Sequence, residues 1–204
     1  FAYGLSLDTW NGFCARPEFL ELYKGRDVRG MGDEKNGTHN TKDWGWFVGG
    51  VYQKGSDQLY LDTKQLDENG QATPTVIVPT ISNIRNGSNM DGARLSKWEI
   101  DKSGDGLYKY EENDFPIMRY ADVLWMKEEA IMRGASGAAS GINTPDFQTM
   151  LARNFAYDKG IDTFKEQYGD PSSWTLKDIL DERGREFTWE MIRRRDLIRF
   201  GEFA

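Results

Sequence analysis

The sequence predicts a mainly α-helical fold with long loops and a few short strands. Gly, Asn, Asp and Thr interrupt the first 116 residues every few positions, so no long helical period survives there. After Pro116, apolar residues recur close to every 3.6 positions, as in a helix that buries one face. Two short runs, 59–61 and 75–78, have strand-like composition. Residues 1–116 are therefore predicted to be a loop-rich, ligand-facing segment, and residues 117–204 a helical scaffold.

Each expected helix has a recognisable start or stop signal. A short one is expected after Pro17, because proline suits the first helical position, with Gly25 beyond its end. Gly134 ends the first long helix, while Thr144 and Thr175 provide N-cap hydroxyls for the next two. The long helices are expected at 117–133, at 145 to about 160, and from 176 past Met191 on a single face.

The third long helix is heavily charged, with acidic and basic residues interleaved. Asp181 and Arg185 are spaced i,i+4, as are Glu190 and Arg194, a spacing worth roughly 0.2–0.5 kcal/mol per exposed pair. The pattern indicates a solvated or partner-packed helix carrying ion pairs. Because acidic residues interrupt the basic ones, it does not indicate a nucleic-acid-binding face.

Composition narrows the function classes. The chain has 204 residues, 38% hydrophobic and 29% charged, and a net charge of −7, which argues against binding phosphate backbones. Its apolar runs are too short to span a membrane, and its first residues do not resemble a signal peptide. With one cysteine, Cys14, and one histidine, His39, it cannot build a disulfide framework or a cysteine zinc site, and a histidine triad is disfavoured. No GxSxG, HExxH or Walker motif is present.

Two long motifs carry a resemblance to a known family. The run 114–124, Asp-Phe-Pro-Ile-Met-Arg-Tyr-Ala-Asp-Val-Leu, is followed by Met-Lys-Glu-Glu-Ala at 126–130. The second motif covers 180–201, with Met191-Ile192 where many members have glycine and a polar residue. Weaker matches lie at 11–14, 17–19 and Asp27-Val28-Arg29-Gly30. In this order the motifs resemble the SusD/RagB family of bacterial surface lipoproteins.

The resemblance implies a SusD-like α fold, of which this chain is the C-terminal part. The tetratricopeptide-like N-terminal half and the lipid-bearing cysteine would precede it. The implied function is to capture oligosaccharide or polysaccharide at the extracellular face of the outer membrane. The cargo would pass to a SusC-like TonB-dependent transporter, without catalysis or nucleic acid. The motif residues are expected to be buried or semi-buried polar anchors between helices, which identify the fold rather than the ligand site: Arg119, Asp122, Arg185, Glu186 and Asp196.

Glycan capture requires aromatic faces for sugar rings and polar groups for their hydroxyls. Trp44 and Trp46 alternate around Gly45, so in an extended chain they point to one side and form a stacking platform beside Asp43. Trp10 and Asn11 form a second candidate glycan-binding pair. The alternative is that Trp46 packs beneath a long loop, as most tryptophans do. Trp125 and Trp189 lie in helical patterns and are expected in the core.

A calcium-loop spacing occurs at Asp101, Ser103, Asp105 and Glu112, with a glycine at the sixth position. An EF-hand needs flanking helices, whereas a strand-like run precedes this segment and Pro116 follows it. The favoured interpretation is a polar hairpin loop, and no cofactor is expected.

Three other functions stay open. The same fold could capture peptide, in which case the tryptophans matter less than backbone hydrogen bonds. A glycoside hydrolase would need two opposed carboxylates a few ångströms apart, which sequence neighbours such as Glu111 and Glu112 cannot establish. A purely structural surface protein would bind no small ligand saturably.

Overall fold

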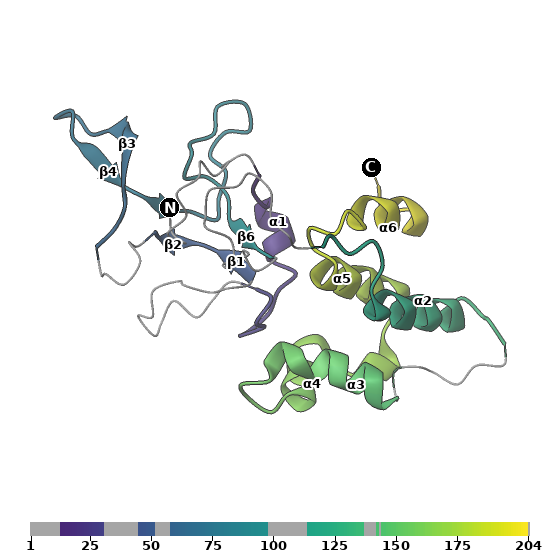
Figure 1. The fold of residues 1–204 in the computed structure, drawn as a ribbon. Helices are drawn as coiled ribbons and strands as arrows, with labels where there is room; N and C mark the ends of the chain where they lie inside the picture. The colour runs from purple at the N-terminus through teal and green to yellow at the C-terminus, as the bar shows by residue number, and fades with distance from the viewer. Residues whose placement is uncertain are drawn as a thin grey trace. The chain divides into compact units, whose positions relative to one another are not determined.

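The computed structural model describes residues 13–30, 45–51, 58–97, 114–136, 142 and 144–203 (Figure 1). The chain forms two compact units. Phe1–Glu21 and Gly30–Asp114 form the strand unit, while Leu22–Arg29 and Phe115–Ala204 form the helical unit. The short segment Leu22–Arg29, here called the strap, therefore belongs to the helical unit although the chain on both sides of it belongs to the strand unit.

The described part of the strand unit contains three two-stranded antiparallel sheets. β1 (Gly45–Phe47) pairs with β6 (Arg94–Ser96), β2 (Gly49–Gly50) with β5 (Val76–Ile77), and β3 (Leu61–Leu66) with β4 (Ala72–Pro74). The helix α1 (Pro17–Leu20) begins at its proline, as predicted. β5 lies within the predicted run 75–78, but the expected strand at 59–61 begins only at Leu61 and extends to Leu66. Among the residues of this unit that the structure describes, the buried apolar ones are Ala15, Leu20, Trp46, Val48, Ile77 and Ala93.

The helical unit confirms the mainly α prediction. Its α-helices are α2 (Tyr120–Met132), α3 (Pro145–Ala152), α4 (Ile161–Tyr168), α5 (Leu176–Glu186) and α6 (Arg193–Phe200), with 3-10 turns at Arg153–Phe155 and Pro171–Ser173. α3 and α4 lie side by side, as do α2 and α5 (Figure 1). Thr175 caps α5 in a reciprocal capping box with Asp178, whereas the side chain of Thr144, the other predicted cap, makes no capping hydrogen bond at the start of α3.

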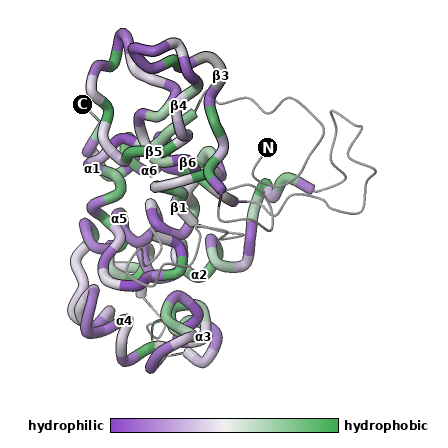
Figure 2. The backbone as a smooth tube through the Cα atoms, turned by 90° about the vertical axis from the view of Figure 1, so that its left-hand side faces the viewer, coloured by the Kyte–Doolittle hydropathy of each residue, from purple (hydrophilic) through white to green (hydrophobic). Residues whose placement is uncertain are grey.

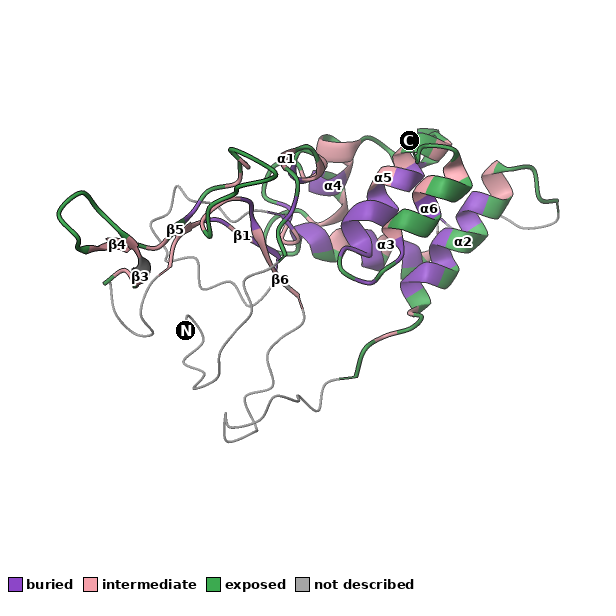
Figure 3. Ribbon diagram, turned by 90° about the horizontal axis from the view of Figure 1, so that it is seen from above, coloured by how far each residue is buried: buried purple, intermediate pink, exposed green. Residues whose placement is uncertain are grey.

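One aromatic cluster organises the core of the helical unit. The Trp125 ring is fully buried, stacks on Trp174 at 6.0 Å between centroids, and meets Phe147 edge-on at 4.7 Å. Phe155 and Phe164 meet edge-on at 6.3 Å beside it. Buried and exposed positions alternate along α2, α3 and α5 (Figure 3), and hydrophobic and hydrophilic stretches alternate along the backbone (Figure 2). The predicted core position of Trp125 is thus confirmed.

Two predicted helix boundaries were wrong for identifiable reasons. α2 begins at Tyr120 rather than near residue 117, because Arg119 is extended (φ −122°, ψ 157°) with its side chain held by distant carboxylates. The helix expected from 145 to about 160 ends at Ala152. Gly160, with φ of +57°, precedes α4, a helix of eight residues that the sequence analysis did not predict.

The third predicted helix is two helices. α5 ends at Glu186, and the junction contains two non-glycine residues with left-handed backbone, Trp189 (φ 70°) and Met191 (φ 60°). Met191 is therefore not on the apolar face of a continuous helix but 87% exposed, and Trp189, expected in the core, is 43% exposed. Local periodicity could not reveal this break, because the junction residues are ordinary helix formers.

Candidate functional site

Trp46 is the one predicted glycan-binding residue within the described part of the chain. It lies on β1 with only 2% of its surface exposed, and its ring meets Phe19 edge-on at 6.1 Å. Its backbone N–H donates to the Gly30 carbonyl at 3.2 Å. This burial supports the packing role that the sequence left open for Trp46, and a role in ligand contact stays a prediction.

The other predicted ligand residues, Trp10, Asn11, Asp43 and Trp44, lie outside the described residues. The same holds for the calcium-loop residues Asp101, Ser103, Asp105 and Glu112. Among the residues that the structure does describe, no cluster of three or more His, Cys, Asp or Glu side chains is arranged to hold a metal ion. Within the same ranges, no helix has the length and apolarity needed to cross a membrane.

An ordered polar loop in the strand unit connects β5 to β6. Asp91 Oδ2 accepts hydrogen bonds from the hydroxyl of Ser82 (2.6 Å) and from the backbone N–H groups of Ser82 and Ser88 (both 3.2 Å). The Ser82 hydroxyl is the main cause that lowers the pKa of the Asp91 carboxyl. The Arg94 guanidinium closes the loop by donating to the carbonyl of Asn89 at 2.7 Å. Ile84, within the same loop, is 90% exposed.

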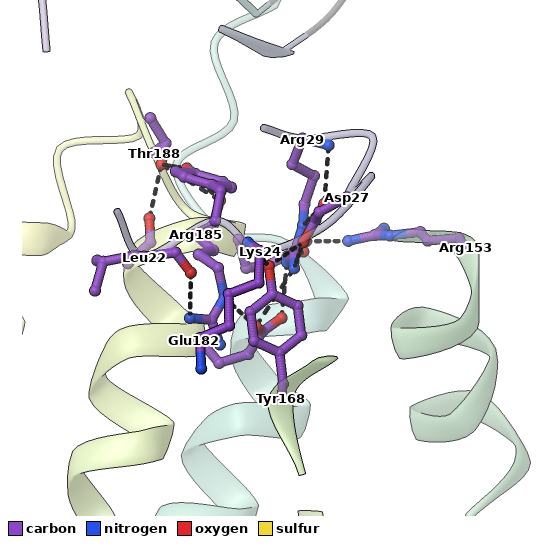
Figure 4. Close-up of polar contacts among 12 residues, drawn as sticks. Leu22, Lys24, Asp27, Arg29, Arg153, Tyr168, Glu182, Arg185 and Thr188 are labelled. Atoms are coloured by element: carbon purple, nitrogen blue, oxygen red, sulfur yellow. Dashed lines mark hydrogen bonds and ion pairs between the residues drawn. The ribbon is translucent and has the colours of Figure 1, made fainter. Parts of the chain in front are cut away.

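A buried network of charged side chains lies where the strap meets α5 (Figure 4). Arg29 of the strap donates to Asp27 Oδ2 (2.7 Å), Glu182 Oε1 (2.7 Å) and Glu186 Oε2 (3.2 Å). Glu182 and Glu186 are four residues apart, so they project from one face of α5. Arg185 Nε donates to Glu182 Oε2 at 2.7 Å. The three acidic side chains are at most 2% exposed.

The network continues from α5 towards the start of α2. Arg119 grips Glu190 with two nitrogens, each at 2.8 Å, and donates to Glu186 Oε1 at 3.0 Å. Arg153, just after α3, donates to the same Glu186 oxygen. Glu186 is thus shared by three arginines from three segments that are far apart in sequence. The predicted anchor roles of Arg119, Arg185 and Glu186 agree with these contacts.

Electrostatics explains why these charges tolerate burial. Burial by itself would raise the pKa of the Glu186 carboxyl, but Arg29, Arg153 and Arg119 outweigh it and hold that pKa at about 2. Burial also opposes ionisation of Asp27, yet neighbouring Arg29 lowers the pKa of this carboxyl overall. The carboxylates of Glu186 and Asp27 therefore stay ionised at neutral pH, paired with guanidinium groups as buried charges must be.

Polar bonds hold the strap along nearly its whole length. Tyr168 donates its hydroxyl proton to Asp27 Oδ2 (2.9 Å) and accepts from the Lys24 backbone N–H (2.8 Å). Burial, and next the charge of Asp27, raise the pKa of this tyrosine. Further bonds join Arg185 to the Leu22 carbonyl (3.0 Å), Tyr23 to the Thr188 hydroxyl (2.6 Å), the Val28 N–H to the Asn154 carbonyl (3.0 Å), and Tyr157 to the Arg26 carbonyl.

A second ionic centre surrounds Arg183, whose side chain is fully buried. It contacts Asp122 of α2 at 2.8 Å and Asp196 of α6 at 2.7 Å, and so ties both helices to α5. These contacts agree with the anchor roles predicted for both aspartates. The i,i+4 pairs predicted from spacing were wrong: Asp181 contacts Lys177 at 2.8 Å, and Glu190 contacts Arg119 rather than Arg194.

The two ionic centres hold segments of the helical unit together. Their carboxylates accept from arginines, which removes the free acid and base that glycoside hydrolysis requires. The sequence reasoning did not predict that the strap docks on α5. The available signal was the weak motif match at Asp27–Gly30, which contains both the carboxylate and the arginine of the strap.

The chain is similar in sequence to the family that its motifs resemble. The sequence model of the SusD family matches residues 3–204. The chain is 32% identical over 118 residues to the starch-binding protein SusD of Bacteroides thetaiotaomicron, a match that covers 56% of this chain. The chain spans 18% of the length of that relative. No solved structure matches the chain.

Proposed function

The chain belongs to the SusD family, and we propose that it is part of a surface protein that binds oligosaccharide or polysaccharide. The observation that carries this proposal is the family match over residues 3–204, together with a relative that is a starch-binding protein by name. Family membership supports a binding protein rather than an enzyme. The bound glycan would be delivered to a TonB-dependent transporter of the SusC type, with the protein held at the outer membrane by an N-terminal lipid.

We assign the ligand contacts to the strand unit. In the helical unit, the described arginines and carboxylates of the two ionic centres neutralise one another, and a sugar could displace them only by leaving buried charges unpaired. The strand unit offers instead the segment around Trp44 and the polar loop closed by Asp91 and Arg94. A tryptophan face and backbone or side-chain polar groups are the recognition elements that a sugar ring requires.

The test is a calorimetric titration of the full-length protein with a panel of neutral oligosaccharides, starch fragments included. We expect saturable binding to one glycan class and a loss of about tenfold in affinity for Trp44→Ala, because the variant removes a large aromatic face and a tenfold change corresponds to about 1.4 kcal/mol. The matched control is Trp189→Ala, which removes a partly exposed tryptophan of the helical unit.

The outcomes separate the alternatives. Binding that survives Trp44→Ala places the site elsewhere in the protein. Saturable binding of peptides, with none of the glycans, would replace glycan by peptide as the cargo. Release of shortened sugars during the titration would indicate a hydrolase and contradict the proposal.

A further inference from the structure

The strap bonds to two different parts of the helical unit. On one flank, Tyr168 at the end of α4 donates to Asp27 Oδ2 (2.9 Å) and accepts from the Lys24 N–H (2.8 Å). On the other flank, Arg29 donates to Glu182 of α5 at 2.7 Å (Figure 4). Asp27, a charged residue, is the buried residue of the strap, so polar contacts rather than apolar packing hold the strap in place.

The strap carries its own pair of opposite charges. Arg29 donates to Asp27 through its backbone N–H (2.9 Å), its Nε (3.0 Å) and its Nη2 (2.7 Å). Both residues belong to the strap, so the pair stays together wherever the strap goes. The strap therefore docks and leaves as a neutral pair at its buried point.

The face of α5 that the strap covers also keeps its own counter-ions. Arg185 Nε donates to Glu182 Oε2 at 2.7 Å, and Arg119 donates to Glu186 Oε1 at 3.0 Å. Arg153 donates to the same oxygen of Glu186. Departure of the strap therefore leaves neither carboxylate without a cation, whereas separation of an isolated buried pair would strand a charge at high cost.

A buried amide adjoins the point where the strap docks. The backbone carbonyl of Asn154 accepts the Val28 N–H at 3.0 Å. The Asn154 side chain is 1% exposed, and among the described residues neither its nitrogen nor its oxygen has a hydrogen-bond partner. An unpaired polar group opposes the conformation that buries it, because water satisfies it only on exposure.

We propose that the strap is a releasable latch, which opens and closes as a unit over the face of α5 that carries Glu182 and Glu186. Opening hydrates this face and the Asn154 amide, and closure restores the directional bonds of Arg29. The latch lies within the helical unit, and its movement does not depend on which ligand the protein binds.

The aromatic core gives the latch a stable base. Trp125 meets Phe147 of α3 at 4.7 Å and stacks on Trp174 at 6.0 Å, and none of these rings belongs to the strap. Ile179 of α5 is fully buried in the same core. Because these contacts survive departure of the strap, its opening requires less free energy than unfolding of α5.

The test is native-state amide hydrogen exchange on the full-length protein. The Lys24 and Val28 amides report docking, because their acceptors, the Tyr168 hydroxyl and the Asn154 carbonyl, lie outside the strap. We expect these two amides to exchange with one common free energy of opening. That free energy should lie below the value for the Ile179 amide, which bonds within the first turn of α5.

Two substitutions should move the latch in opposite directions. Arg29→Gln removes the ion pairs to α5, so exchange at Lys24 and Val28 should accelerate together by about tenfold, with no change at Ile179. Asn154→Leu removes the unpaired amide at similar volume and should slow both amides by about fivefold. Faster exchange in Asn154→Leu would contradict the hydration of this amide on opening.

Arg199→Gln is the matched control for a general loss of stability. Arg199 also joins two carboxylates of the helical unit, Glu129 and Asp196, neither of which bonds to the strap in the described contacts. This variant should lower the melting temperature and leave exchange at Lys24 and Val28 unchanged.

Three results would overturn the latch. Exchange of Lys24 and Val28 as slow as that of Ile179 would show that the strap opens only when the helical unit unfolds. Unequal acceleration of the two amides in Arg29→Gln would show that the strap does not move as a unit. Equal acceleration in Arg199→Gln would show that both variants act through general stability.

Discussion

At the scale of single residues, Glu186 shows how a position within a family motif can be structural. Its carboxylate is shared by Arg29, Arg119 and Arg153, which reach it from three segments. Burial raises the pKa of this group, but the three guanidinium groups lower it further, to about 2 from an ordinary value of 4.5. Because the folded pKa lies below the unfolded one, ionised Glu186 stabilises the fold above pH 4.5, and this contribution is lost as the pH falls towards 2.

The prediction is a pH-dependent difference between wild type and Glu186→Gln. The difference in their free energies of unfolding should be constant near neutrality and shrink by about 3 kcal/mol as the pH falls through this window. Denaturant titrations from pH 7 to pH 2 measure it. Glu202→Gln, at an exposed position near the C-terminus, is the control for the loss of a surface carboxylate. A difference for Glu186→Gln that stays constant with pH would contradict the ion-pair explanation.

At the scale of elements, the junction between α5 and α6 stores backbone strain. Trp189 and Met191 have positive φ on either side of Glu190, whose carboxylate is held by Arg119. The left-handed conformation costs a non-glycine residue about 1–2 kcal/mol. The ion pair between Glu190 and Arg119 thus stabilises a left-handed backbone that the side chains of Trp189 and Met191 disfavour. This junction leads into α6, whose Asp196 contacts Arg183.

Met191→Gly should therefore stabilise the protein. Met191 is 87% exposed, so little packing is lost, while glycine adopts a φ of 60° without steric penalty. We expect the free energy of unfolding to rise by about 1 kcal/mol in urea titrations. Met191→Ala removes the same side chain but keeps the strain, so it should have almost no effect. A stabilisation by alanine equal to that by glycine would show that side-chain exposure, not backbone strain, is responsible.

At the scale of the whole molecule, the two units have cores of different character. The helical unit buries interlocking aromatic rings around Trp125, Phe147 and Trp174. The described residues of the strand unit form two-stranded sheets and bury only a few apolar side chains. Isolated two-stranded sheets are only marginally stable, so this unit depends more on its loops.

Native-state hydrogen exchange should report this contrast. We expect the slowest amides in α2, α3 and α5, near Trp125, Phe147 and Ile179, and faster exchange in the β3–β4 pair. The comparison is made on full-length protein across a series of low denaturant concentrations. Equal protection in β3–β4 and α5 would show that the two units open together, contrary to this prediction.

The sequence by itself determined the helical class of the C-terminal half, the proline and threonine helix starts, and the identity of its charged anchors. These features follow from local signals: periodicity, capping residues and motifs. Only the tertiary structure decided which charges pair. Arg119 reaches Glu190 across 71 positions and Arg29 reaches Glu182 across 153, whereas the i,i+4 partners suggested by spacing are unused. It also decided that Trp46 is buried and that α5 stops at Glu186, because long-range contacts there outweigh local preference.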